Sequence, residues 1–170
     1  MNQTLTSLSL CLLASGCIVA VGNTGPVAEA VEKHRTRQEL EGVIDEFKAA
    51  YESGEIRRVF LDSIADSDSV IVIGSLSEEW TVGADTLREG ASGDGGEVQF
   101  VGRDLHSSEL QVSDDGTVGW LIERADLHYE VGGERVSLVG FRATSIWERV
   151  DGEWKIVHFH GSMPDLISEI

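Results

Sequence analysis

Long strand-forming segments joined by tight turns fill the second half of the chain and constrain its fold more than any other feature. Gly132-Gly133 and Asp151-Gly152 are typical of two-residue hairpins, since such turns need backbone angles that glycine and aspartate adopt readily. Asp114-Asp115-Gly116 indicates another turn. The segments between these turns predict strands over residues 98–105, 107–112, 118–131, 135–149 and 154–160, where 107–112 is either a separate strand or a bent continuation of the first.

The part of the chain between the uncharged first 28 residues and the strand-forming second half has mainly the pattern of helices. An apolar stripe at helical spacing runs from Leu40 to Tyr51, and Thr36 and Glu39 predict a capping box at the start of this helix. Ser53-Gly54 is expected to end it. Helices followed by a meander of antiparallel strands predict an α+β fold, in which the helices pack on one face of a curved, mostly antiparallel sheet. Shorter elements are predicted as helices over 56–64 and 84–91, strands over 70–73 and 80–83, and a glycine-rich loop over 90–96.

The first 28 residues form an apolar leader without a charged side chain. Its run from Leu8 to Val21 has the length of a signal-peptide core, because a transmembrane helix needs about 20 apolar residues. Ala14-Ser15-Gly16-Cys17 resembles the lipobox of bacterial lipoproteins, although no Lys or Arg precedes the run. Two interpretations stay open: the protein is exported or anchored to a membrane through a lipidated Cys17, or the leader is an over-extended start of a cytoplasmic protein. We expect a linker over 29–35, the folded domain over 36–165 and a tail over 166–170.

The charge of the chain excludes one class of function and suggests a habitat. The 30 acidic residues outnumber the 13 basic ones, which gives a formal net charge of −17. A nucleic-acid-binding protein needs a basic surface to displace counterions, so no nucleic-acid partner is expected. The acidity, with few lysines, suggests a halophilic protein that stays soluble in strong salt.

The strands at the end of the chain resemble those of a known superfamily. Thr144-Ser145-Ile146-Trp147 is followed by an Asp-Gly hairpin and by the segment Trp154-Lys155-Ile156-Val157-His158-Phe159-His160-Gly161-Ser162. This pattern resembles the SnoaL-like group of the nuclear transport factor 2-like superfamily, and also the association domain of calcium/calmodulin-dependent kinase II. The resemblance covers residues 36–165. It implies a cone-shaped α+β barrel with a pocket at its open end, and homodimers or rings formed across the outer face of the sheet.

Histidines alternate with apolar residues in the last predicted strand. Strict alternation would place His158 and His160 on the same face as Ile156. Both histidines are candidates for acid–base chemistry or ligand orientation, because imidazole titrates near neutrality; the alternative is hydrogen-bonded structural residues. A metal would need a third ligand such as His128 or Asp126, and no motif of fixed spacing supports one. We therefore predict no metal site.

Asp126 and His128 share one face of the strand over 118–131, together with Trp120, if no bulge intervenes. A carboxylate in an apolar cone would have a raised pKa suited to proton transfer, whereas the alternative for Asp126 is a solvated group or the partner of an arginine. Arg142 is isolated in an apolar strand and needs an anion, either Glu123 or Asp126 or a ligand carboxylate.

Further candidates complete the expected pocket. In relatives, a tryptophan at the place of Trp80 lines the pocket mouth, and otherwise it caps the core. The candidate residues are Asp126 and His160 for catalysis and, for ligand binding, Trp80, Trp120, His128, Arg142 and His158.

These observations leave three functional hypotheses. The first is a small-molecule-binding protein with an apolar pocket rimmed by Trp80, Trp120, His158 and His160. As an enzyme it would transfer protons on a hydrophobic carbonyl compound, by isomerisation, cyclisation or dehydration, without a cofactor. The second is an oligomerisation module, and the third is a lipoprotein that sequesters an apolar ligand, which depends on Cys17. The expected partners are a small apolar ligand and a second copy, because both faces of the last strand carry apolar residues.

Overall fold

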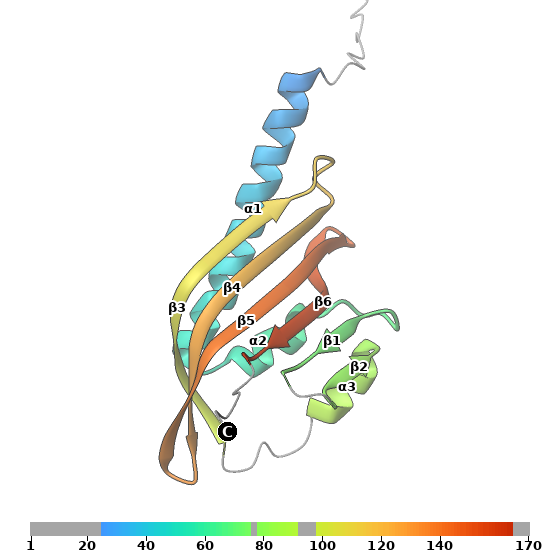
Figure 1. Cartoon of the computed structure of the whole chain (residues 1–170). Coiled ribbons are helices and arrows are strands. Elements are labelled where there is room, and N and C mark those ends of the chain that lie inside the picture. The colour runs from blue at the N-terminus through green and yellow to red at the C-terminus, as the bar shows by residue number, and fades with distance from the viewer. Residues whose placement is uncertain (1–24, 76–77, 92–97, 165–170) are drawn as a thin grey trace, which may run out of the picture.

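The computed structural model describes residues 25–75, 78–91 and 98–164, and within them it confirms the α+β class (Figure 1). A six-stranded sheet in the order β2-β1-β6-β5-β4-β3 is antiparallel throughout except for the parallel pair β1–β6. The helices are α1 (Pro26–Ser53), α2 (Ile56–Ser63) and α3 (Ala84–Ala91). The strands are β1 (Ile71–Ile73), β2 (Trp80–Val82), β3 (Val98–Val112), β4 (Val118–Val131), β5 (Glu134–Val150) and β6 (Glu153–Ser162).

Helix α1 begins ten residues earlier than the predicted capping box. Gly25 precedes Pro26, and proline suits the first helical position because a backbone N–H there would have no partner within the helix. Gly54 ends the helix with a φ of 76°. Residues 29–35, expected as a linker, are therefore helical, and the first turns of α1 extend beyond the sheet (Figure 1). The capping-box prediction is wrong because Thr36 is buried in the middle of the helix.

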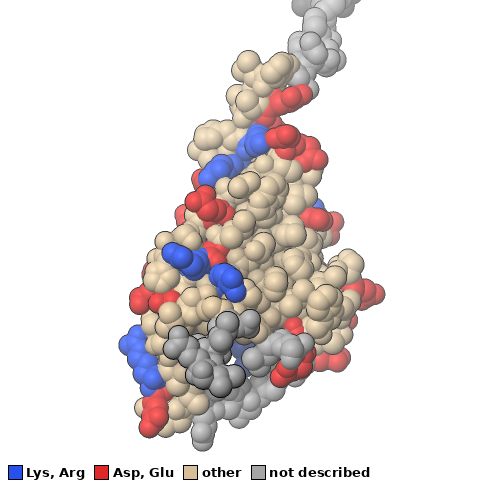
Figure 2. All heavy atoms as spheres, viewed as in Figure 1, with Lys and Arg blue, Asp and Glu red and all other residues tan. Residues whose placement is uncertain are grey.

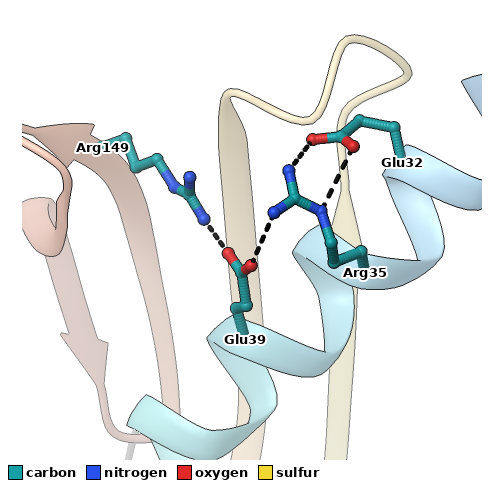
Figure 3. A network of polar contacts seen from close by, with 4 residues as sticks. All are labelled: Glu32, Arg35, Glu39 and Arg149. Carbon is teal, nitrogen blue, oxygen red and sulfur yellow. Dashed lines mark hydrogen bonds and ion pairs between the residues drawn. The ribbon is translucent and has the colours of Figure 1, made fainter.

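Glu39, the other half of the expected capping box, joins α1 to the sheet instead. Its carboxylate accepts hydrogen bonds from Arg149 of β5 and, at 3.4 Å, from Arg35 one turn earlier in α1 (Figure 3). Arg35 also pairs with Glu32. Four side chains in an ionic network thus fix the middle of the helix to the end of β5, and a network of this kind holds geometry better than an isolated surface pair.

The core lies between α1 and one face of the sheet. Leu40, Ile44 and Phe47 of α1 pack with the inward side chains of the strands, among them Trp147 and Ile156. Trp147 is completely buried, its indole nitrogen donates to Ser145 Oγ at 2.8 Å, and its ring meets the edge of Phe47 at 5.7 Å. Its polar atom is therefore satisfied where water cannot reach it.

Bulges interrupt the regular alternation of three strands. In β3 the register shifts between Phe100 and Gly102 and again between Leu105 and Ser107, so this strand is the bent continuation rather than two strands. The other shifts fall opposite Asp126, where β5 has an extra residue, and at Val157 in β6. Because side chains alternate with a period of two, each extra residue changes which later side chains face the core.

Several expectations concern residues beyond the described ranges. Cys11 and Cys17, most of the glycine-rich loop and the tail over 166–170 lie outside them. Among the described residues, no helix is both long enough and apolar enough to cross a membrane.

Candidate functional site

A cavity of about 490 Å³ lies between the end of α1, the start of α2 and the neighbouring parts of strands β3 to β6. Six of its eleven described lining residues are aromatic, and the residues with polar side chains among them are Arg57, Gln99, Tyr51 and Tyr129. Its described lining consists of Tyr51, Gly54, Ile56, Arg57, Phe60, Gln99, Phe100, Leu127, Tyr129, Phe141 and Phe159. Size and composition match those of small-molecule sites, which are concave and mostly apolar with few polar groups.

The aromatic wall is held by edge-to-face ring contacts. Phe100 lies between Tyr51 and Tyr129, with ring centroids 5.3 Å and 5.6 Å away, and Phe60 meets Phe159 at 5.2 Å. Tyr51 also meets Phe47, whose ring contacts the buried Trp147. Such contacts favour fixed ring orientations, so the wall is formed without a ligand.

Two of the bulges place rings in this wall. Trp147 pairs with Ile156 but Ile146 pairs with His158, so Val157 is the extra residue of β6. Phe159 consequently faces the core side, where it contacts Phe60 and lines the cavity. The expected alternation is therefore wrong beyond Ile156, and His158 and His160 lie on the opposite face. In β5, the bulge opposite Asp126 does the same for Phe141.

The cavity tyrosines are hydrogen-bond donors at neutral pH. Burial raises the pKa of Tyr51 to about 12, while the nearby Arg103 acts in the opposite direction. Burial also raises the pKa of Tyr129, and the charge of Glu79 adds to this effect. Both hydroxyls therefore keep their protons and can donate to a ligand oxygen.

A buried ion pair supports the Tyr51 side of the cavity. Arg103 Nη1 of β3 lies 3.1 Å from Glu123 Oε2 of β4, and the two side chains are only 10% and 9% exposed. Ser108 Oγ donates to the other carboxylate oxygen at 3.2 Å, and the guanidinium lies 4.0 Å from the centroid of the Tyr51 ring. Glu123 is thus committed to Arg103, not to Arg142 as one of the sequence alternatives had it.

The predicted acid–base pair lies on the outer face of the sheet, away from the cavity. Asp126 accepts the backbone N–H of Gly140 at 2.8 Å and pairs with His106 at 3.0 Å, whereas His128 pairs with Asp104 at 3.1 Å and Ser137 at 2.8 Å. Asp126 and His128 do share a face, as predicted. The Gly140 N–H lowers the pKa of Asp126, and His106 adds to this, so the expected raised pKa is wrong.

The remaining candidates also lie outside the cavity. Trp80 is 62% exposed on β2, and Arg142 donates to the carbonyl of Met163 at 3.3 Å. Cross-strand pairing puts Trp80 in one outer-face row with His160, and Trp120 in the next row with His158. The predicted rim of Trp80, Trp120, His158 and His160 is therefore corrected: the structure brings these residues together on the outer face, not around the pocket.

Within the described ranges, no three His, Cys, Asp or Glu side chains come together as a metal site. His158 and His160 lie on strand β6, two strands away from His128 and Asp126 on β4. The third ligand considered from the sequence is therefore not brought to them.

The aromatic wall was missed by sequence reasoning, but glycines next to two of its rings carry a signal. Gly140 precedes Phe141 with a φ of 79°, and a Cβ at Gly161 would lie 2.9 Å from Phe141 Cζ. An isolated glycine in a strand often marks a bulge or a close approach, and here it marks both.

Comparisons with known proteins agree with this architecture. The structure is similar to a nuclear transport factor 2-like protein of unknown function from Pseudomonas putida KT2440, with a TM-score of 0.56 and 15% identity over 81% of this chain and 93% of the other. It is similar to a candidate calcium/calmodulin-dependent kinase II association domain from Exiguobacterium sibiricum 255-15, with a TM-score of 0.56 and 17% identity over 75% and 92%. A candidate scytalone dehydratase from Novosphingobium aromaticivorans DSM 12444 gives 0.61 and 12% over 79% and 88%.

At these identities the similarity shows the fold alone, and no curated protein matches the sequence. The sequence comparison is more specific than the structural one. Residues 40–166 match the SnoaL-like domain family, in agreement with the resemblance of the final strands. The chain therefore belongs to the SnoaL-like domain family and has the nuclear transport factor 2-like cone fold.

Proposed function

We propose that this protein binds a small, flat, apolar molecule carrying a hydrogen-bond acceptor, in the cavity lined by six aromatic rings. The aromatic lining of a cavity of about 490 Å³ is the observation that carries the proposal. The rings supply apolar contact area at low entropic cost, and the protonated hydroxyls of Tyr51 and Tyr129 match a carbonyl or ether oxygen.

Binding is favoured over proton-transfer catalysis by the composition of the wall. A base that removes a proton must reach the substrate within hydrogen-bond distance. None of the described lining residues is Asp, Glu or His, and the candidates Asp126 and His160 lie on the opposite face of the sheet. The dehydratase activity after which the structurally similar protein from Novosphingobium aromaticivorans is named is, for this chain, an activity to test.

The binding proposal is tested with N-phenyl-1-naphthylamine, a neutral aromatic dye whose fluorescence rises in apolar sites. We expect saturable binding, weakened at least about tenfold by Ile56→Trp, which fills the cavity from the start of α2. Val31→Trp is the matched control, because Val31 is 62% exposed on the part of α1 far from the cavity in sequence. Equal affinity of Ile56→Trp and wild type, or no saturable binding, would contradict the proposal.

We also propose that a second copy of the chain covers the outer face of the sheet. Two cross-strand rows there consist mainly of apolar side chains, with one histidine in each row, and contain a single acid, Glu109, at the end of the second row. The rows run Val82–Ile71–His158–Ile146–Trp120–Gln111 and Trp80–Ile73–His160–Thr144–Ile122–Glu109. In Figure 2 uncharged side chains cover much of the middle of the visible surface, and acidic side chains lie mainly along its margins.

The size and charge of this face support self-association. Strands β3 to β6, about 4.8 Å apart and at least ten residues long, together with the three-residue strands β1 and β2 give roughly 700 Å², which is close to the area of about 800 Å² that each partner buries in a standard stable interface. Two copies of a chain with a net charge of −17 repel each other, so they associate best where acids are scarce.

Light scattering tests the self-association with paired charge substitutions. Ile122 is 44% exposed in the second row, and Ile122→Glu should turn a dimer into a monomer at micromolar concentration. Val31→Glu introduces the same charge at an exposed valine outside the sheet and should leave the dimer intact. A monomeric wild type would contradict the proposal, as would a dimer that Ile122→Glu does not weaken.

A further inference from the structure

We propose that Asp126 is a positioning residue of the aromatic cavity: from the outer face, its carboxylate holds the β5 bulge that turns Phe141 into the cavity wall. The inference rests on the proposed function, since it gives Asp126 a part in ligand binding without contact to the ligand.

The register of β4 and β5 shows what the bulge does. Ala125 pairs with Phe141 and Leu127 with Leu138, so Asp126 stands opposite both Val139 and Gly140. Leu138 and Phe141 are three residues apart and yet pair with the inward-facing Leu127 and Ala125. In a regular strand, residues three apart point to opposite faces. Phe141 therefore reaches the cavity because the extra residue is there.

The extra residue leaves the N–H of Gly140 out of the strand ladder, and Asp126 Oδ1 accepts it at 2.8 Å. The φ of Gly140 is 79°, a conformation in which a side chain is strained, and a Cβ there would also lie 3.1 Å from Pro164 Cγ. The bulge leaves the Gly140 N–H without a main-chain acceptor, and the Asp126 carboxylate takes the place of that acceptor.

The same carboxylate also holds the bulge on the other neighbouring strand. His106 is the extra residue of β3, between Leu105 and Ser107, and its Nε2 lies 3.0 Å from Asp126 Oδ2. Asp126, on the strand between them, ties both irregular points together. The lowered pKa of Asp126 agrees with a carboxylate that is charged while it makes these contacts.

The experiment compares Asp126→Ala, Asp126→Asn and the control Asp104→Ala. Asp104 pairs with Asp126 across β3 and β4 and its carboxylate contacts His128, whereas the Gly140 N–H of the β5 bulge is held by Asp126. Three quantities are measured: exchange of the Gly140 amide hydrogen by NMR, nuclear Overhauser contacts of the Phe141 ring with the Gly161 backbone that it approaches closely, and the affinity for N-phenyl-1-naphthylamine.

We expect Asp126→Ala to speed Gly140 exchange at least about tenfold, to remove the ring contacts and to weaken dye binding at least about fivefold, because the orphaned N–H no longer holds the bulge. Asp126→Asn should stay within about twofold of wild type, since its amide oxygen still accepts the N–H. Asp104→Ala should change none of the three. An Asn variant that behaves like wild type distinguishes a positioning role of Asp126 from acid–base catalysis, because asparagine keeps the acceptor oxygen but cannot take up and release a proton as a carboxylate does.

Unchanged Gly140 exchange and unchanged Phe141 contacts in Asp126→Ala would overturn the inference, as would an Asn variant as impaired as the Ala variant. If the wild type binds no dye, the proposed function fails, while exchange and ring contacts still decide the positioning. If Asp126→Ala does not fold, the contact is tested in the wild type by an acid titration followed by NMR. The chemical shift of the Gly140 amide should then change as Asp126 takes up its proton, and an amide shift that stays constant would refute the contact.

Discussion

Arg103→Met tests whether the buried ion pair beneath Tyr51 carries a large share of the stability. Methionine keeps the length and the apolar stem of the side chain but removes the charge that compensates Glu123. Removing one partner of a buried pair costs about 3–5 kcal/mol of unfolding free energy, because the other charge stays in a poorly solvated place. For a domain of this size, that loss corresponds to a fall in Tm of about 6–20 °C.

The assay is urea unfolding followed by circular dichroism, with the same substitution at an exposed pair as control. Arg37 Nε lies 2.8 Å from Glu41 Oε1, a distance as short as that between Arg103 and Glu123, but these side chains are 47% and 46% exposed. Arg37→Met should therefore cost less than about 1 kcal/mol. The double variant Arg103→Met/Glu123→Gln should recover most of the loss, because no buried charge is left alone. Equal losses for Arg103→Met and Arg37→Met would refute the reasoning.

Four further predictions concern packing, pH and salt. Gly119→Ala should cost about 1–3 kcal/mol in thermal unfolding, because its Cβ would lie 2.1 Å from Cδ2 of the fully buried Leu40; Leu40→Val in the same background should restore part of the loss. Tyr51 keeps its proton to about pH 12 when folded but to about pH 10 when unfolded, so its contribution to the unfolding free energy should fall by about 2–3 kcal/mol over this window; Tyr51→Phe should remove this contribution in urea titrations, while a fall due to Tyr129, whose pKa burial also raises, should remain. The pKa of Asp126 is lowered by folding, so its stabilisation is present above about pH 4 and is lost as the pH falls through the folded value; Asp126→Asn should lose less stability than wild type below pH 4. The urea midpoint should rise from low to molar KCl because salt screens a net charge of −17, and a salt-independent midpoint would count against the halophilic interpretation.

Local signals in the sequence predict the elements well. The hairpins at Gly132-Gly133 and Asp151-Gly152 form where their turn chemistry requires, and α3 spans Ala84–Ala91 as expected. The start of α1 was misplaced because Thr36 and Glu39 have capping-box spacing inside a continuous helix, where burial of Thr36 and the contact of Glu39 with Arg149 give them other roles. Tertiary contacts here override a local pattern.

The candidate site was predicted less well because one extra residue in a strand reverses the face on which every later side chain lies. The bulge at Val157 sends His158 and His160 to the outer face and Phe159 to the cavity, and the bulge before Phe141 has the same effect. Periodicity alone cannot locate such a bulge. Gly140 and Gly161 were the available indications, and their meaning depends on neighbours that only the folded chain brings together.

The interlocked rings also give the molecule optical properties. Trp147, Phe47, Tyr51, Phe100 and Tyr129 form an unbroken series of edge-to-face contacts from the closed core to the cavity wall, with centroid separations of 5.3–5.9 Å. Rings held in fixed, asymmetric packing give a near-ultraviolet circular dichroism signal, which is lost when that packing is lost. A colourless ligand that shifts Tyr129 would therefore be visible in the spectrum of the unlabelled protein, through the same rings that build its core.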